Sequence, residues 1–188
     1  GSTTVGAFMD AAIEAFEVIN PDVSISYEGT GSSAGIEAVQ AGTVSLAGAS
    51  RGLKPEETDA GCIAYEVALD GVAVIVNNSV AVDDLTLEQI AKIYAGEITD
   101  WSEVIDGAEG EIVVVNRDAA SGTRAAFFEL VMEKALGKDP EPQFTTNSIE
   151  TDSNGNMVAT VNSTPNAIGY CGMGYLSELT DGKAVSVE

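Results

Sequence analysis

The sequence predicts an α/β protein, because apolar segments with helical spacing alternate along the chain with apolar runs of strand type. A hydrophobic content of 45% with only 20% charged residues is typical of a folded globule rather than a disordered acidic tail. A chain of 188 residues is long enough to bury a core, either as one domain or as two small ones.

The N-terminal third is expected to contain two helices and two strands. Apolar residues recur at helical spacing from Phe8 to Ile19, and an Asn-Pro pair ends that helix. VSISYE (23–28) alternates like a strand, a short helix surrounds Ile36, and VSLAGAS (44–50) is a second apolar strand.

The middle of the chain holds a long β-type run, CIAYEVALDGVAVIVNN (62–78). The Asp-Gly pair inside it leaves two interpretations: two strands joined by a kink, or one segment that crosses between two lobes. Thr86 and Gln89 form a capping box before LEQIAKIYAG, which predicts a helix that ends at Gly96.

The C-terminal half continues the alternation. EIVVVN (111–116) is a strand of buried type, and a further helix is expected near 157–161. NAIGYCGMGYL (166–176) is a strand-like run interrupted by glycine, and the final KAVSVE is also strand-like. After EIVVVN, a helix is predicted that stops at Gly137. Its apolar face is made by Ala125, Phe128, Met132 and Ala135.

The formal net charge of −22 argues against DNA, RNA and anionic membrane surfaces as partners, because the long-range field of the protein repels polyanions. No apolar run approaches the length of a membrane span, and no signal peptide is visible. Any small anion that binds must therefore be held by short-range, well-aimed donors.

Motifs for catalysis and metal binding are poorly represented. The absence of histidine excludes Ser-His-Asp and Cys-His arrangements, no cysteine cluster has zinc-site spacing, and no Walker A motif is present. Cys62 and Cys171 lie far apart in sequence, either as two buried thiols or as a disulfide. We therefore expect binding without chemistry and without a cofactor.

Three turns share one local pattern: GSTTVG (1–6), GTGSSAG (29–35) and AASGTR (119–124) are small, rich in hydroxyl groups, and precede a helix. A helix N-terminus offers unpaired N–H groups and a partial positive charge, and serine and threonine add neutral donors. Each turn taken singly can be a plain N-cap. Together they predict a shared anion site.

Two of the three arginines flank the third turn. Arg117 ends a predicted strand, and its planar fork matches a tetrahedral oxyanion better than the point charge of lysine does. The alternative for Arg117 is an ion pair with Asp118 or another carboxylate. Arg124 lies in the first helical turn and is expected to make a surface or interdomain ion pair rather than to bind a ligand.

An ordered set of segments resembles the phosphate-binding proteins of ABC-type phosphate importers: GSTTV, EGTGSSAGIEAVQAGTV, GASRGLKPEE, LDGVAVIVNNSVAVDDLTLEQIAKIYAGEITDWSEV, RDAASGTRAAFFE and PNAIGY. The resemblance implies a two-lobe, type II periplasmic-binding-protein fold. It also implies inorganic phosphate bound between lobes that close about a hinge, an ABC permease in the membrane as partner, and no catalysis. The expected location is extracytoplasmic, in the periplasm or as a cell-surface lipoprotein.

The resemblance also assigns a phosphate site residue by residue. Arg51 stands where some family members place an aspartate that accepts a proton from phosphate, which leaves the discrimination against sulfate open. For Arg51 a salt bridge to Glu56 or Glu57 is as plausible as a ligand role. The expected phosphate-binding residues are Thr4, Val5, Ser32, Ser50, Arg51, Arg117, Ser121, Gly122 and Thr123.

The expected domain organisation places lobe one at residues 1–70 and lobe two at 71–168, with 169–188 as a return segment towards lobe one. Family members continue well past PNAIGY, so the usual C-terminal part of lobe one is expected to be missing from this chain. The chain is then truncated, given without its remaining piece, or a reduced variant. A reduced lobe one is expected to expose apolar surface and to favour self-association or a partner.

Two other functional classes are weighed against phosphate capture. The same fold can serve another oxyanion, or act as a signalling or adhesive surface protein. An enzyme that processes phosphoesters on this scaffold is the least favoured class, because the chain has no histidine and no recognisable metal set.

Overall fold

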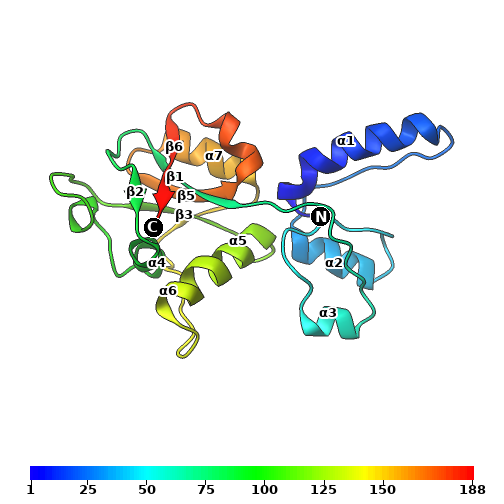
Figure 1. The fold of residues 1–188 in the computed structure, drawn as a ribbon, viewed down its shortest axis with the longest axis horizontal. Helices are drawn as coiled ribbons and strands as arrows, with labels where there is room; N and C mark the ends of the chain where they lie inside the picture. Colours follow the sequence, from blue (N-terminus) through cyan, green and yellow to red (C-terminus); the bar gives the residue numbers. More distant parts are fainter.

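A five-stranded sheet forms the centre of the larger of two parts in the computed structural model, which describes all 188 residues (Figure 1). The strand order is β4-β3-β5-β1-β6. β3 runs parallel to β4 and β5, whereas β1 runs antiparallel to β5 and β6. The strands are β1 (Val72–Asn77), β3 (Val113–Arg117), β4 (Ile149–Thr151), β5 (Ala167–Gly172) and β6 (Gly182–Ala184).

Helices cover both faces of this sheet, with α7 above it and α4 to α6 below it in Figure 1. Side chains alternate across a strand, so Val74 and Val76 of β1 enter the core beneath the sheet and Ile75 enters the core beneath α7. The helical elements are α4 (Leu87–Ala95), η1 (Trp101–Glu103), α5 (Gly122–Phe127), η2 (Phe128–Glu133), α6 (Lys134–Leu136), α7 (Asn154–Ser163) and η3 (Met173–Glu178).

In this part α4, α7 and the run from α5 to α6 lie where the sequence predicts helices, whereas η1 and η3 are not predicted. The strand-like run 166–176 forms β5 only as far as Gly172 and continues as η3. The Thr86–Gln89 capping box starts α4, and Gly96 ends it in the left-handed conformation with φ of 78°. α5, η2 and α6 follow one another up to Gly137, with a π-helical turn in the middle. Met132, on the predicted apolar face, is fully buried.

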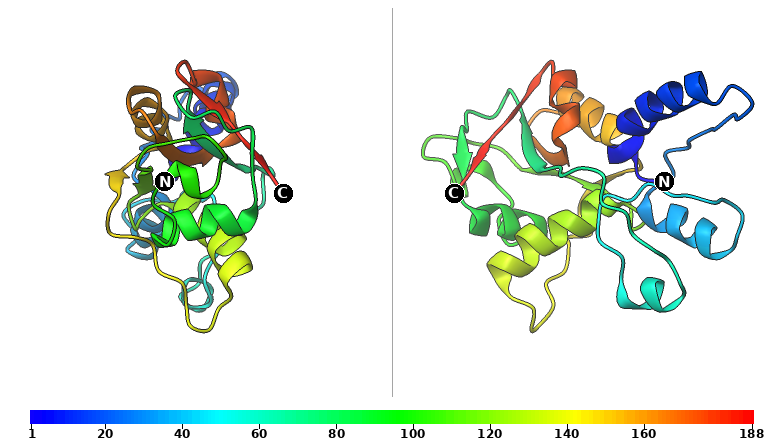
Figure 2. Two further views of the ribbon diagram at one scale, coloured as in Figure 1. Left: turned by 90° about the vertical axis from the view of Figure 1, so that its left-hand side faces the viewer. Right: turned by 45° about the vertical axis from the view of Figure 1, so that its right-hand side comes forward.

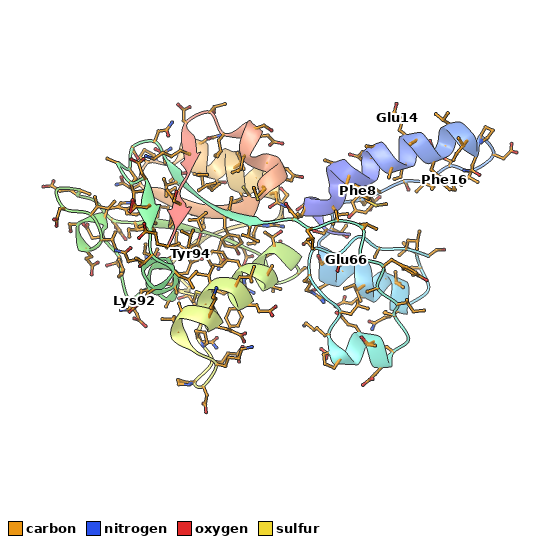
Figure 3. All side chains as sticks on the ribbon, viewed as in Figure 1. Phe8, Glu14, Phe16, Glu66, Lys92 and Tyr94 are labelled. Carbon is orange, nitrogen blue, oxygen red and sulfur yellow. The ribbon has the colours of Figure 1, made fainter.

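The smaller part, residues 1–70, has three helices and no strand: α1 (Thr3–Ile19), α2 (Ser32–Gln40) and α3 (Pro55–Asp59). No residue of α1 is buried, and Ile36 is the single buried hydrophobic residue of the first seventy. In Figure 3, Phe8 and Phe16 lie along a projecting helix with few neighbours, while Tyr94 lies among packed side chains. We call residues 1–70 the small lobe and residues 71–188 the large lobe.

The two strands predicted in the small lobe, 23–28 and 44–50, are wrong as strands. Their alternating pattern is present, but a strand exists only through hydrogen bonds to a neighbouring strand, and these segments have none. In the run 62–78 the strand begins only at Val72, directly after the Asp-Gly pair. The preceding part of that run crosses from the small lobe to the sheet (Figure 1).

The last twenty residues differ in position from the expected return towards lobe one. β6 pairs with β1, and β7 (Ser186–Val187) pairs with β2 (Asp84–Leu85), so both strands extend the large lobe. The edge of β1 that does not face β5 pairs with β6, which includes the first residues of the strand-forming sequence KAVSVE. Within 169–188, the Tyr175 hydroxyl still reaches the small lobe and donates to the carbonyl oxygen of Thr3, at 2.9 Å.

Candidate anion site

The three hydroxyl-rich turns meet where the two lobes touch. The Ser33 N–H donates to the Ala120 carbonyl oxygen at 3.2 Å, which joins the turn before α2 to the turn before α5. The hydroxyls of Thr4 and Thr123 lie 2.6 Å apart and join α1 to α5. Figure 2 shows the start of α5 beside the N-terminus in its right-hand view. The first turns of α1, α2 and α5 therefore converge on one point.

Serine hydroxyls line this meeting point. Ser2 Oγ donates to Ser50 Oγ at 2.8 Å, and the hydroxyls of Ser32 and Ser50 lie 3.4 Å apart. The Ser50 N–H donates to Ser32 Oγ at 3.1 Å, which fixes the position of that oxygen. A side chain at Gly122 would collide with the hydroxyls of Ser32 and Ser50. The close approach of the lobes therefore requires glycine at this position.

Arg117 lies at the end of β3 with only 1% of its surface exposed. Its Nη2 donates to the carbonyl oxygen of Asp152 at 3.0 Å, but Nε and Nη1 have no hydrogen-bond partner. Burial lowers the pKa of Arg117, although a guanidinium remains protonated in proteins. Two unpaired, buried, charged donors are rare and indicate that an acceptor belongs beside them.

The expected alternative for Arg117, an ion pair with Asp118, is absent. The Asp118 carboxylate instead accepts a hydrogen bond from the Ala120 N–H at 2.7 Å and shapes the turn before α5. The Tyr170 hydroxyl and the Asn116 side chain both accept from the Arg117 N–H, at 3.3 and 2.9 Å. These contacts fix the backbone from which the guanidinium projects.

Capping and anion binding turn out to be compatible in these turns. Ser2 accepts from the Thr4 N–H at 3.2 Å and caps α1, and Ser121 accepts from the Arg124 N–H at 3.1 Å and caps α5. α2 has a glycine N-cap without a side-chain bond. The N–H groups of Gly122 and Thr123 precede the first hydrogen-bonded turn of α5 and are available to an anion.

Arg51 is engaged by a carboxylate. Its two terminal nitrogens donate to the two Glu57 oxygens, at 2.8 and 2.6 Å, and Nη2 also lies 3.3 Å from Ser33 Oγ. The bidentate contact lowers the pKa of Glu57 to about 2, because the guanidinium donates to and attracts the ionised carboxylate. Of the two roles considered for Arg51, the salt bridge to Glu57 is the one the structure contains.

Arg124 is not part of the expected ion pair. Its guanidinium carbon lies 4.6 Å from the centre of the Phe144 ring, in a cation–π contact inside the large lobe. No carboxylate lies within ion-pair distance of it. Its Nε is buried without a hydrogen-bond partner, so the contact with Phe144 positions the guanidinium but does not pair this donor.

The family model of a PBP superfamily domain matches residues 1–187. This chain belongs to the PBP superfamily. It is 34% identical over 175 residues to the phosphate-binding protein PstS of Borreliella burgdorferi and 32% identical over 180 residues to PstS of Bacillus subtilis. These alignments cover 93% and 95% of this chain but 62% and 57% of the relatives. The chain therefore spans about 60% of the length of these relatives.

Solved structures show the same relationship. A substrate-binding protein of the phosphate ABC transporter type from Clostridium perfringens, solved with bound phosphate, is 45% identical with a TM-score of 0.88. An ABC-type phosphate transport receptor from Vibrio cholerae is 31% identical with a TM-score of 0.74. Both matches cover all of this chain, and 73% and 74% of the solved chains. The resemblance to phosphate-binding proteins of ABC importers is confirmed.

The expected fold class, the mixed α/β fold of periplasmic phosphate-binding proteins, is confirmed. Apolar side chains such as Leu46 and Leu69 lie exposed on the small lobe. No helix is both long and apolar enough to cross a lipid bilayer. The thiols of Cys62 and Cys171 are both free, so the two do not form a disulfide.

Two buried polar residues at the meeting point are absent from the sequence prediction. Ser2 belongs to the first turn and is signalled by its position before α1, where serine is a preferred cap. Asn154 is fully buried at the start of α7 and contacts Thr3 and Thr4. No local pattern predicts the role of Asn154, because its partners lie about 150 residues away in sequence.

Proposed function

We propose that this protein captures inorganic phosphate between its lobes and delivers it to an ABC permease in the membrane. The proposal covers a binding role without catalysis, at an extracytoplasmic location, either in the periplasm or as a cell-surface lipoprotein. It is supported by the relatives named above, of which the chain spans about 60%. The single observation that carries it is the pair of unpartnered donors on buried Arg117 beside three hydroxyl-rich helix starts.

In the proposed site Arg117 supplies a charge-assisted fork to one edge of the anion. The hydroxyls of Thr4, Ser32, Ser50 and Thr123 and the backbone N–H groups at the start of α5 replace its hydration shell. Val5 is proposed to contribute its N–H, which in the structure donates to the Ser2 carbonyl oxygen at 3.2 Å. The full set of proposed ligands is Thr4, Val5, Ser32, Ser50, Arg117, Ser121, Gly122 and Thr123. Arg51 is proposed to position Ser33 and the segment after Ser50 rather than to bind the anion. Its terminal nitrogens already donate to Glu57, and one of them also contacts the Ser33 hydroxyl.

Closure follows from the origin of these donors. Thr4, Ser32 and Ser50 belong to the small lobe, whereas Arg117 and Thr123 belong to the large lobe. An anion that accepts hydrogen bonds from both lobes binds the closed arrangement better than the open one and so shifts the population towards closure. Neutral donors allow this in a protein with a net charge of −22, since they need no long-range attraction.

Calorimetric titration with phosphate near pH 5 and pH 8 tests the proposal, with Arg117→Ala as the site variant. Arg124→Ala is the matched control, because this second arginine of the same segment stacks on Phe144. We expect Arg117→Ala to weaken phosphate binding by about 100-fold, as loss of a buried charged donor pair does, and Arg124→Ala to stay within a few-fold. Undiminished affinity of Arg117→Ala would sink the assigned site.

A second candidate ligand, a fully ionised oxyanion such as sulfate, is favoured by one observation. Arg51, which is paired with Glu57, stands where the family resemblance places a proton-accepting aspartate. Of the two aspartates whose charge acts on Arg117, Asp118 accepts from the Ala120 N–H and Asp152 accepts from the Asn156 amide. Competition calorimetry with sulfate and arsenate against phosphate decides this, and sulfate that displaces phosphate at equal concentration would make the site a general oxyanion receptor.

A further inference from the structure

Asn154 connects the two lobes through every polar atom of its side chain. It is fully buried at the first position of α7. Its Nδ2 donates to Thr3 Oγ1 at 3.0 Å and to Thr4 Oγ1 at 2.9 Å, both in the small lobe. Its Oδ1 accepts from the Gly172 N–H at 3.2 Å, in the large lobe. One amide therefore joins the first turn of α1 to the end of β5.

The orientation of this amide is determined by its partners. A backbone N–H can only donate, so the atom that faces Gly172 must be the amide oxygen. The NH₂ group then faces the two threonines, and both of its protons are used there. An amide turned the other way would bring two donors together at Gly172.

The same contact orients a hydroxyl of the proposed anion site. Thr4 Oγ1 accepts from Asn154, so its own proton is directed away from the amide. The nearest group on that side is Thr123 Oγ1, 2.6 Å away across the lobe boundary. Asn154 thus leaves Thr4 as a donor towards the point where the three helix starts converge. Thr3 is held a second time, through its carbonyl oxygen, by Tyr175.

We propose that Asn154 is an interlobe latch, a positioning residue that holds the closed lobes together and slows the release of the bound anion. The inference rests on the proposed function for the identity of the anion. Separation of the lobes exchanges the bonds from Asn154 to Thr3 and Thr4 for bonds to water, which costs the net stabilisation of two hydrogen bonds. The latch therefore acts on the closed state and does not touch the anion.

The kinetic test measures association and dissociation of inorganic phosphate by stopped flow in two single variants. Asn154→Ala removes the amide, and Thr3→Val removes one of its two acceptors in the small lobe while keeping the shape of that side chain. We expect each variant to raise the dissociation rate constant about tenfold and to leave the association rate constant within about twofold.

Asn162→Ala is the matched control for a purely structural effect. Its amide lies on the same helix and makes three hydrogen bonds, with Glu178, Thr180 and Asp181, all inside the large lobe. We expect this variant to lower thermal stability while phosphate dissociates as in the wild type. The proposal is overturned if Asn154→Ala loses stability in the same way and also keeps the wild-type dissociation rate.

A distance measurement tests the latch without any ligand. Spin labels are placed on Cys62 in the small lobe and on an Ala81→Cys variant in the large lobe, both in accessible positions. Cys171 stays unlabelled, because it is buried and burial raises the pKa of its thiol to about 12. We expect Asn154→Ala and Thr3→Val to lengthen and broaden the interlobe distance, and Asn162→Ala to leave it unchanged.

Identical distance distributions in the wild type, Asn154→Ala and Thr3→Val would overturn the latch. Failure of the wild type to bind phosphate would overturn the proposed function instead, while the distance experiment would still decide the latch. The double variant is a further check, because a direct contact can be lost only once. It should match the stronger single variant, and a fully multiplicative effect would contradict a direct contact between the two residues.

Discussion

Every buried hydrophobic residue except Ile36 lies in the large lobe, whereas the small lobe buries mainly serine, glycine and glutamate. The large lobe has one hydrophobic cluster on each face of its sheet. It also has stacked aromatic rings, among them Phe127 and Tyr170, whose ring centres lie 4.1 Å apart. The small lobe is held by polar contacts, among them the Arg51–Glu57 pair. Polar contacts therefore order the small lobe, whereas the burial of apolar side chains orders the large lobe.

This difference has a functional consequence. The proposed anion site lies where the polar contacts of the small lobe meet the rigid end of β3 and the start of α5. The large lobe supplies a preformed half with Arg117 already placed by buried neighbours. The small lobe supplies hydroxyls whose positions depend on contacts across the boundary.

The largest expected effect comes from the core of the large lobe. Ile75→Ala should lower the free energy of unfolding of this lobe by about 3 kcal/mol, because Ile75 is fully buried between β1 and α7. Urea unfolding followed by the fluorescence of Trp101, the single tryptophan, reports on this lobe alone. A loss below about 1 kcal/mol would show that packing here is looser than the structure indicates.

The next effect tests the contact between the lobes. Gly122→Ala should weaken phosphate binding about 10- to 100-fold, because a Cβ at this position collides with Ser32 and Ser50 and holds the lobes apart. Gly155→Ala is the control, since a Cβ there meets no atom within 4 Å. Calorimetric titration measures both. Equal affinities of the two variants would mean that the lobes need not approach this closely to bind.

A smaller effect concerns the acid stability of the small lobe. The pKa of Glu57 is lowered from 4.5 to about 2, so its ion pair stabilises the fold above about pH 4.5, and this contribution disappears as the pH falls to about 2. Glu57→Gln should therefore melt below the wild type at pH 6 and level with it near pH 2, as measured by far-ultraviolet circular dichroism. The exposed neighbour Glu56→Gln is the control, and a pH-independent difference for Glu57→Gln would contradict the ion pair as its cause.

The smallest effect is expected on the surface of the small lobe. Leu69 is 90% exposed, so Leu69→Ser should change the free energy of unfolding by no more than about 0.5 kcal/mol. The same variant should reduce binding of the dye ANS, which reports exposed apolar surface. A loss above about 1 kcal/mol would show that Leu69 is covered in solution, by a second copy of the chain or by another polypeptide.

Local signals in the chain predict α4, α7 and the helix that begins at α5. They also predict Arg117 as the charged residue of the proposed anion site. The capping box at Thr86 and Gln89 predicts α4 to the residue, since caps act over three or four positions. Arg117 is predicted because strand, arginine and hydroxyl-rich turn are contiguous in sequence. The Arg51–Glu57 contact is also close in sequence, and for it the prediction already named two roles.

Strands and interlobe contacts depend on partners that the local sequence does not contain. The segment 23–28 has the pattern of a strand and forms none, because no neighbour is present to complete its hydrogen bonds. KAVSVE has the same kind of pattern and forms strands, because β1 and β2 offer it edges. The sequence by itself determined the α/β class, the boundaries of α4 and the arginine at the end of β3. Only the tertiary structure decided which edges are paired, that Ser2 joins the serine cluster, and that Asn154 spans the lobes, because these contacts join residues that are distant along the chain.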